Sequence, residues 1–423
     1  MDKRSFLFLQ GAATPFFDRL AKAIRRAKID TCRVKFCCGD ALYHKGGDAV
    51  SYVGGTADLS TFYKELFSER NVTDLVLFGD TRPVHIPAIK LAKELNLRIH
   101  VYEEGYLRPD WITMDRGGVN AYSPLPKSPN YYREAVLKVP RRVVSQKTGY
   151  SQWIRLAEDM VYNVARLGDF KYYPKYTRHR LHGPAQEYFG WVKRHSMLPF
   201  HGIYASRLMR QLLKTKAKYY VYPLQLDSDS QVRVHSPYGD GVNSATEEII
   251  RSFAKHASKD AFLVIKNHPL DTGITKHKKF AYKTASENGV RSRVRFIEAG
   301  HLPTFLGHAA GTVLINSTTG MSALFHQCPT IALGKALYDI PGLTFQGGLN
   351  DFWRRAKTPN RQLFMAFRDV VIHKTQINGN FYTKKGVEMA VKGSLRRLGI
   401  PPIPEPEPEA KVAIDNQVVA DNF

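Results

Sequence analysis

The sequence predicts an α/β protein of two domains joined by a basic, largely helical connector. The chain has 423 residues, of which 43% are hydrophobic, so it is long enough for more than one core. Short apolar runs typical of buried strands alternate with helical patterns in both halves of the sequence. From about residue 123 to residue 220 this pattern changes, and the part from 151 to 220 contains 13 lysines and arginines but only 4 acidic residues.

The first domain is expected over residues 1–122. The expected strands are 6–9, 33–36, 74–78 and 98–102, and the expected helices are 16–27, 59–67 and 87–95. The apolar run 5–9 is too short for a signal peptide, so we interpret it as part of the first strand. Polar residues gather directly after these strands, at the edge where open parallel sheets bind ligands.

The connector is expected over residues 123–217, with a helix at 153–167. Aromatic residues interleave with basic residues in it, as in 171–176. Such a segment is typical of proteins that bind an anionic lipid surface or a nucleic acid. The alternative is a solvated helical linker without a partner.

The second domain is expected over residues 218–400. Its expected strands are 219–224, 262–266, 294–297, 313–315 and 330–333. Helices are expected at 245–257, 278–288, 302–308 and 320–326, and again within 351–374 and 385–398. The Pro/Glu-rich tail 401–423 is predicted to be disordered.

Composition narrows the classes of partner. The formal net charge is +24, which favours nucleic acid, an anionic membrane surface or acidic sugars. No uninterrupted apolar run approaches about 18 residues, so no transmembrane helix is expected. The four cysteines match neither a zinc site nor a disulfide framework, which indicates a reduced, cytoplasmic compartment.

The segment 312–333 is the first candidate site, because it reads as strand, polar turn, helix and strand. The turn contains Asn316, Ser317, Thr318, Thr319 and Gly320. Free backbone N–H groups at a helix N-terminus favour an anion, so this turn predicts a phosphate site. The alternative is that Ser317 or Thr318 simply caps the helix.

A second candidate lies after the strand at 98–102, where Glu103 and Glu104 precede Gly105. Adjacent strand residues point to opposite faces, so only one glutamate is expected to face a cleft. Arg108 offers a guanidinium that can hold a carboxylate or phosphate with two hydrogen bonds. The alternative is an ion pair between Arg108 and a glutamate.

Two further groups follow strands of the second domain. Asp229 is a candidate nucleophile or base, although Asp227 and Asp229 also match the three-residue metal motif Asp-X-Asp; helix capping is the alternative. We expect no metal there, because the flanking order of elements does not suit that motif. Pro269 takes the chain out of the sheet and presents His268, beside Lys266, at the strand end. His268 is a candidate for stabilising leaving-group charge or, alternatively, a local hydrogen-bonding residue.

Two α/β domains facing each other across a cleft form the GT-B layout of many glycosyltransferases and of some epimerases, so the layout alone does not give the function. The order and spacing of the polar motifs are more specific. They are Glu103-Glu104-Gly105 with Arg108, Gln225 with Asp229, Lys266-Asn267-His268-Pro269, and Asn316 to Gly320 followed by Ala323-Leu324. Together they resemble the KpsS/LipB family of capsule polysaccharide proteins over nearly all of residues 5–400.

The resemblance implies a GT-B-like β-Kdo transferase with two Rossmann-type domains. Its donor would be CMP-β-Kdo, and its acceptor a phosphatidylglycerol-type lipid that receives the first Kdo of a capsule linker. A protein of this kind would be peripheral on the inner face of the inner membrane, beside other capsule proteins. No metal or other cofactor is implied.

The resemblance also assigns roles by position. Asp229 matches the carboxylate that attacks the anomeric carbon, and Glu103 or Glu104 the base that deprotonates the acceptor. His268, with Lys266 and Pro269 around it, lies near the CMP phosphate. The remaining matches hold the nucleotide or sugar: Gln225, Asn316, Ser317, Thr318, Thr319 and Gly320. Apart from the resemblance, the carboxylate of Kdo needs a cation, which Arg108 or Arg233 could supply.

Two other functions compete with this one. A non-catalytic partner in capsule assembly or export would bind lipid-linked polymer through the basic connector and would not need Asp229 or His268. A nucleic-acid binder is suggested by charge alone, and the sequence contains no recognised nucleic-acid module. We therefore expect no nucleic-acid partner.

Overall fold

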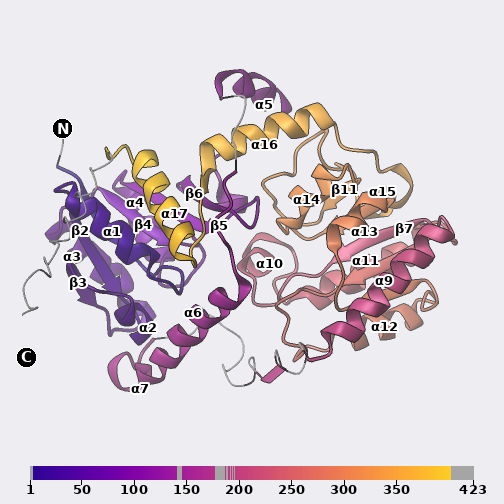
Figure 1. Cartoon of the computed structure of the whole chain (residues 1–423), viewed down its shortest axis with the longest axis horizontal. Coiled ribbons are helices and arrows are strands. Elements are labelled where there is room, and N and C mark those ends of the chain that lie inside the picture. The colour runs from indigo at the N-terminus through magenta and orange to yellow at the C-terminus, as the bar shows by residue number, and fades with distance from the viewer. Residues whose placement is uncertain are drawn as a thin grey trace, which may run out of the picture.

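The computed structural model describes residues 3–140, 145–176, 186, 189, 190, 192, 194 and 196–401. Within these residues the chain forms two α/β domains side by side (Figure 1). Each domain is built on its own sheet, so the predicted fold class, two Rossmann-type domains in the GT-B layout, is confirmed. The predicted disorder of 401–423 lies outside the described residues, apart from Pro401.

The sheet of the first domain has seven strands in the order β12-β6-β5-β4-β1-β2-β3. The strands from β3 to β5 are parallel, whereas β6 runs antiparallel to both of its neighbours. Their bounds are β1 Ser5–Phe8, β2 Asp30–Lys35, β3 Asp48–Ser51, β4 Asp74–Phe78, β5 Arg98–Glu104, β6 Trp111–Arg116 and β12 Gln376–Asn378.

Helices cover both faces of this sheet. Phe6 and Phe8 pack against α1 (Phe16–Arg26) and α17 (Lys384–Arg397), while Leu7 packs with α3 and α4 on the other face. A parallel strand covered on both faces is apolar along its whole length, which is why β1 and β4 were readable as short apolar runs. The other helices are α2 Cys38–Leu42, α3 Leu59–Glu69 and α4 Ile86–Glu94.

The second sheet has five parallel strands in the order β11-β10-β7-β8-β9. All five expected strands are present, with ends shifted by at most a few residues. They are β7 Tyr219–Pro223, β8 Phe262–Lys266, β9 Val294–Ile297, β10 Gly311–Leu314 and β11 Thr330–Ala332. Alternate residues of β7 pack to opposite sides, with Tyr220 towards α11 (Val242–His256) and Tyr219 towards α9 (Leu198–Lys214) and α13 (Leu302–His308).

The helices around this sheet follow the predicted positions closely. Residues 351–374 divide into two helices, because the segment between them, ending in Asn360, leaves the helical conformation and the Asn360 side chain caps the second helix. The bounds are α10 Ser230–His235, α11 Val242–His256, α12 His277–Glu287, α13 Leu302–His308, α14 Thr319–Phe325, α15 Leu349–Arg355 and α16 Arg361–Thr375.

The connector is helical in its described parts, as predicted. Its helices are α5 Pro129–Ala135, α6 Gln152–Ala165, α7 Asp169–Tyr172 and α9 Leu198–Lys214. Helix α5 packs against α16, and α6 packs against α2 of the first domain. The connector therefore belongs to the body of the molecule and is more than a solvated linker.

The expected end of the second domain at residue 400 is wrong. After α16 the chain returns to the first domain, where β12 pairs with β6 and α17 packs on α1 (Figure 1). The first domain thus contains both ends of the described chain. The edge of β6 has backbone groups that need hydrogen-bonding partners, and the antiparallel pairing with β12, from more than 250 positions away, supplies them.

Candidate functional site

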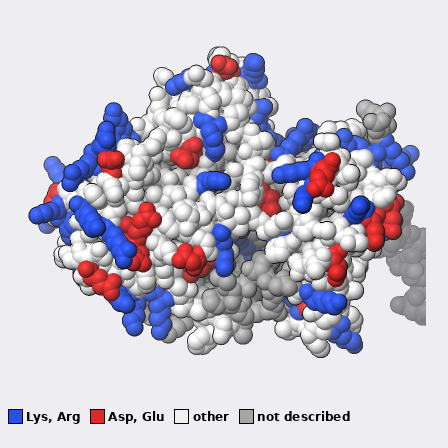
Figure 2. Space-filling view, turned by 180° about the vertical axis from the view of Figure 1, so that it is seen from behind, with Lys and Arg blue, Asp and Glu red and all other residues white. Residues whose placement is uncertain are grey.

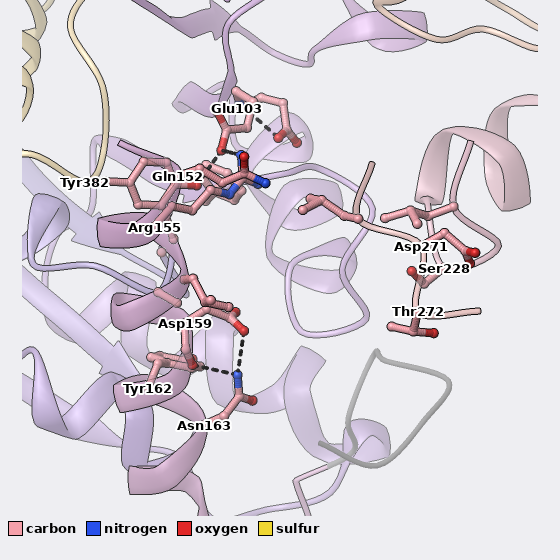
Figure 3. Close-up of a pocket in the computed structure, with 18 of the residues that line it drawn as sticks. Glu103, Gln152, Arg155, Asp159, Tyr162, Asn163, Ser228, Asp271, Thr272 and Tyr382 are labelled. Atoms are coloured by element: carbon pink, nitrogen blue, oxygen red, sulfur yellow. Dashed lines mark hydrogen bonds and ion pairs between the residues drawn. The ribbon is translucent and has the colours of Figure 1, made fainter. Parts of the chain in front are cut away.

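A cavity of about 430 Å³ lies between the two domains. Three parts of the chain line it. The first domain and the returning segment contribute Ala12, Phe78, Arg82, Glu103, Glu104 and Tyr382. Helix α6 contributes Gln152, Arg155, Asp159, Tyr162 and Asn163, and the second domain contributes Leu226, Asp227, Ser228, Asp271 and Thr272. Figure 3 shows the α6 side chains and Glu103 facing Ser228, Asp271 and Thr272 across the open space.

The carboxyl ends of the parallel strands explain this position. Glu103 and Glu104 end β5, whereas residues 226–228 follow β7 and residues 270–275 follow the end of β8. In open α/β sheets, loops at the carboxyl ends of strands form the ligand site. The two such edges face each other here, as the GT-B layout requires.

Both glutamates line the cavity, so the expectation that only one would face it is wrong. The cavity lies at the end of the sheet rather than on one face, and a strand end exposes both of its last side chains there. Glu104 forms an ion pair with Arg155 (3.3 Å) and accepts a hydrogen bond from the Tyr382 hydroxyl. Glu103 accepts a hydrogen bond from the Glu104 backbone N–H at 3.0 Å.

These surroundings separate the acidities of the two glutamates. Burial raises the pKa of Glu103 to about 7, and the neighbouring charge of Glu104 adds to this rise. Burial also opposes ionisation of Glu104, but the charges of Arg155 and Arg108 and the Tyr382 hydrogen bond lower its pKa overall. Two carboxyl groups with separated pKa values are a common feature of acid–base sites. Glu103 is therefore the group suited to exchange a proton near neutral pH.

On the second domain, the expected residues Gln225, Asp229 and Asn316 form one hydrogen-bonded network. The Gln225 amide donates to the Asn316 side-chain oxygen (3.0 Å) and to the Asp229 carboxylate (3.4 Å). Its own oxygen accepts from the Asn316 backbone N–H at 3.1 Å. Residues that follow β7 and β10 are thereby held together at one sheet edge.

Asp229 also caps helix α10, which was the alternative interpretation of this residue. Its Oδ1 accepts the Gln231 backbone N–H at 2.9 Å. Burial raises its pKa, while the charge of Arg108 opposes that rise. A cap and a nucleophile are compatible, because the cap bond occupies one carboxylate oxygen and fixes the direction of the other.

Asp227 has a different role. It accepts the Val242 N–H at the start of α11 (2.9 Å), and its other oxygen lies 3.4 Å from His277 Nε2. Both oxygens of Asp227 are therefore engaged with protein groups. In the described part of the chain, no group of three acidic, histidine or cysteine side chains is arranged to hold a metal ion.

His268 follows β8 and is partly buried. Its Nδ1 accepts the Leu270 backbone N–H at 3.1 Å, so the ring hydrogen of the neutral form is on Nε2. Burial and, to a smaller extent, the charges of Lys266, Arg108, Arg194 and Arg155 together lower its pKa to about 3. His268 is therefore a neutral donor in strongly cationic surroundings.

The same surroundings affect Lys266. Burial lowers its pKa to about 8, and the charge of Arg194 contributes. Arg194 itself holds the loop after β8, because it donates to the carbonyls of His268 (2.6 Å), Pro269 (3.2 Å) and Asp271 (2.7 Å). Cations crowded together without an equal number of carboxylates are typical of an anion site.

Among the described residues, Asn316 connects the turn Ser317–Thr319 to this edge through its bonds with Gln225. The Ser317 hydroxyl donates to Thr319 Oγ1 (3.0 Å) and accepts the Thr319 backbone N–H at 3.2 Å. The Ser317 carbonyl accepts from the Tyr338 hydroxyl, and Gly320 packs so closely on the Tyr338 ring that a Cβ would lie 2.1 Å from it. The three hydroxyl residues are partly exposed and are not among those lining the cavity. Their phosphate-binding role stays a prediction.

Arg108 is exposed, and its guanidinium donates to the Gly105 carbonyl at 3.2 Å. Among the described residues, the ion pair with a glutamate is made by Arg155 and not by Arg108. The charge of Arg108 nevertheless lowers the pKa values of Glu103, Glu104, Asp229 and His268. It therefore lies between the two sheet edges. Arg233, the alternative cation, is exposed on α10 and is not among the lining residues.

Sequence analysis missed Arg155 and Tyr382. Helix α6 was expected only as part of a basic connector, yet Arg155 lies within it and Tyr382 lies in the returning segment, stacked on the Arg155 guanidinium at 5.1 Å. One local signal was available. Polar residues recur at 152, 155, 159 and 163, which is helical spacing, and they indicate a polar face that is distinct from the apolar residues between them.

A family profile and two relatives of known sequence point to the same family. A family profile described as "Capsule polysaccharide biosynthesis protein" matches residues 73–382. The "Capsule polysaccharide export protein KpsS" of Escherichia coli is 34% identical over 380 residues, which are 90% of this chain and 97% of that protein. The "Capsule polysaccharide modification protein LipB" of Neisseria meningitidis serogroup A is 33% identical over 388 residues, covering 90% of this chain and 92% of that protein.

Among solved structures, KpsC of Thermosulfurimonas dismutans, described as a beta Kdo 2,7 transferase, is similar in fold. The sequences are 14% identical, the TM-score is 0.43, and the match covers 93% of this chain and 100% of that chain. At that identity and TM-score the likeness says nothing about the reaction.

Proposed function

Because this chain belongs to the family of capsule polysaccharide biosynthesis proteins, we propose that it is a retaining glycosyltransferase of capsule assembly. The motif resemblance specifies the proposal further: Kdo moves from CMP-β-Kdo to a phosphatidylglycerol-type lipid, beginning the Kdo linker of a capsular polymer. The enzyme would work on the inner face of the inner membrane and uses no metal.

One observation carries this proposal. Glu103, whose pKa burial raises to about 7, lies across an inter-domain cavity from the sheet edge where the neutral His268 lies beside Lys266 and Arg194. The first group suits removal of a proton from an acceptor hydroxyl. The second suits an anionic donor, and both the phosphate and the carboxylate of CMP-Kdo are anionic.

The chemistry follows from these groups. Asp229 attacks the anomeric carbon, and CMP leaves with the electron pair of the broken bond as a phosphate monoester. The His268 Nε2–H and the Lys266 ammonium stabilise the negative charge of the departing phosphate. Glu103 then removes the proton of the acceptor hydroxyl, whose oxygen attacks the same carbon and releases the Asp229 carboxylate. Two inversions give net retention, as in retaining glycosidases.

The other predicted residues hold the donor in this proposal. Gln225 and Asn316 orient Asp229 through their hydrogen bonds, and Ser317, Thr318 and Thr319 bind the nucleotide through hydroxyls and backbone N–H groups. Arg108 binds the Kdo carboxylate from its place between the two edges. Glu104, fixed by Arg155 and Tyr382, stays ionised and helps to keep the Glu103 pKa high.

Calorimetric titration with CMP and with UDP tests the donor class without an acceptor. We expect CMP to bind at least tenfold more tightly than UDP. Product formation from CMP-β-Kdo and phosphatidylglycerol, followed by mass spectrometry, then tests the reaction. Equal binding of the two nucleotides together with no glycolipid product would overturn the proposal.

A second function is supported by the name of a relative, because the E. coli protein is described as an export protein. In that case the chain would be a non-catalytic partner that binds lipid-linked polymer beside other capsule proteins. Cells that carry Asp229→Asn in place of the wild-type chain separate the two functions. An export partner would still give capsule, whereas a transferase would not.

A further inference from the structure

Helix α6 has two faces of opposite character. The residues that line the cavity, among them Arg155, Asp159 and Asn163, occupy one side of the helix. On the opposite side, at helical spacing, Trp153 is 71% exposed and Val164 is 62% exposed. A helix with an apolar outer face is unusual in a folded protein, because that face normally turns towards the core.

This apolar face continues beyond α6. Leu167 and Phe170 follow it in the next turns, and Phe170 is 81% exposed. At the start of α9, Phe200 and Ile203 are also exposed. Figure 1 shows α6 and α7 along the lower edge of the molecule, with the first turns of α9 reaching the same edge. We call these residues the apolar rim; it consists of Trp153, Val164, Leu167, Phe170, Phe200 and Ile203.

The charges around the apolar rim are mainly positive. The acidic residues of α6 and α7 are engaged with protein groups: Glu158 with the Tyr43 hydroxyl, Asp159 with Asn163, and Asp169 with Arg166. Six basic residues of the connector, in contrast, are exposed. They are Lys147, Lys171, Lys175, Arg207, Arg210 and Lys214.

Helix α9 shows how the two features combine. One stripe of it begins with Phe200 and Ile203 and continues, at helical spacing, with Arg207, Arg210 and Lys214, while Leu208 on the other side packs into the second domain. Apolar residues with flanking lysines and arginines are typical of helices that lie in the surface of an anionic bilayer. Figure 2, which views the molecule from behind, shows that lysines and arginines are spread over both domains, so the apolar residues are what distinguish the rim.

We propose that the apolar rim inserts into the headgroup region of an anionic lipid bilayer and that α6 then lies in the membrane surface. None of the described helices is both long and apolar enough to span a bilayer, so contact through such a surface is the form of membrane binding that these residues support. Because the other face of α6 lines the cavity, the bilayer would lie one helix diameter from Arg155 and Glu104. The importance of this short distance rests on the proposed function, because a lipid acceptor in the bilayer would then be close to the two glutamates.

Vesicle flotation with the full-length chain tests the surface. The probes are vesicles of phosphatidylglycerol mixed with phosphatidylethanolamine, and vesicles of phosphatidylcholine alone. We expect binding to the anionic vesicles that weakens with salt, and at least tenfold weaker binding by the triple variant Trp153→Ser, Phe170→Ser, Phe200→Ser. Leu137→Ser is the matched control, because Leu137 is 80% exposed in a 3-10 turn outside the rim. It should bind like the wild type.

Other outcomes overturn the proposal. The wild type failing to bind anionic vesicles, or the triple variant floating as well as Leu137→Ser, would show that the rim does not meet lipid. A wild-type dimer that becomes monomeric in the triple variant, without any vesicle binding, would assign the rim to a second copy of the chain.

Circular dichroism checks that the triple variant is folded, and CMP affinity checks that its nucleotide site is intact. Flotation needs neither donor nor transfer, so its result is independent of the proposed reaction. If the rim binds vesicles but no Kdo is transferred to any acceptor, the membrane surface stands and the proposed function fails. If the triple variant still transfers Kdo to a water-soluble glycerol phosphate acceptor but not to lipid, both proposals are supported.

Discussion

The two sheet edges that meet at the cavity are built differently. At the edge of the first domain, Glu103 and Glu104 both line the open space, and the charges of Arg155 and Arg108 with the Tyr382 hydrogen bond lower the pKa of Glu104 alone below its usual value. At the edge of the second domain, Gln225, Asn316 and Asp229 bond to one another, while His268 lies among cations. The first edge has a group ready to exchange a proton, whereas the second edge is preorganised for an anion.

Two domains of the same Rossmann-type fold therefore differ in chemistry because different residues follow the ends of their strands. Burial is common to both edges, and it raises the pKa values of Glu103 and Asp229 alike. The partners differ, however, and they decide what each carboxylate can do. The following changes test this division, beginning with the largest expected effect.

Asp229→Asn should abolish transfer, with kcat falling by about 10³-fold or more, because a covalent step without its nucleophile leaves only binding and charge stabilisation. Asparagine is an equally good helix cap, so α10 and the free energy of unfolding should change little. Product formation and thermal unfolding are the measurements. Near-normal transfer by a folded Asp229→Asn variant would show that Asp229 only caps α10.

Glu103→Gln should lower kcat/KM by about 10²-fold, the usual contribution of a general base. In the wild type, kcat/KM should rise about tenfold per pH unit on the acid side and level off near pH 7, because the base acts when deprotonated. This acid limb should vanish in Glu103→Gln. In Glu104→Gln it should persist and move to lower pH, since the charge that helps to raise the Glu103 pKa is gone. An acid limb unchanged in Glu103→Gln would exclude Glu103 as the base.

The same shift makes a prediction about stability. The folded pKa of Glu103 is raised from 4.5 to about 7, so its contribution to stability is fully present below pH 4.5 and is lost as the pH rises through about 7. Urea unfolding of the wild type and of Glu103→Gln at pH 5 and pH 8 measures this. The free energy of unfolding of the wild type should fall more between pH 5 and pH 8 than that of Glu103→Gln, because the variant has no carboxyl group to ionise at this position.

His268→Ala should weaken CMP binding by about tenfold, the effect of losing one hydrogen bond to a charged group. Glu103→Gln should leave CMP affinity close to the wild-type value, because Glu103 belongs to the other edge. His301→Ala is the control, since His301 is exposed at the start of α13 and its side chain bonds only Thr304 among the described residues. If Glu103→Gln weakened CMP binding as much as His268→Ala, the division between the edges would be wrong.

Gly320→Ala should have the smallest effect on the reaction and a measurable one on stability. A Cβ there would lie 2.1 Å from the Tyr338 ring, so the free energy of unfolding should fall by about 1–3 kcal/mol. Gly202→Ala is the matched control, because no atom lies within 4 Å of its Cβ position in α9. Alanine there should raise the free energy of unfolding by about 0.5–1 kcal/mol. Equal stability of the two variants in urea would mean that the turn after β10 adapts freely.

The sequence by itself determined the strands, most helices and the motifs at the strand ends. Apolar periodicity and turn residues act over a few positions, so β4, β8, β9 and α13 were predictable to the residue. The polar residues that directly follow these strands could be predicted from the sequence as well, because they are identified from the same short-range pattern. The pattern β11-β10-β7-β8-β9 then brings Gln225, His268 and Asn316 to one edge, as expected for parallel strands.

Only the tertiary structure decided which of these groups meet across the cavity. The Tyr382–Glu104 hydrogen bond joins residues 278 positions apart, and the return of β12 and α17 to the first domain changes the domain boundary. Helix α6 has a polar side that was readable, but its place in the cavity, and with it the Arg155–Glu104 ion pair, depends on how the two domains pack. Local sequence encodes conformation through short-range sterics and periodicity, whereas pKa values depend on burial and on charges that only the folded chain brings together.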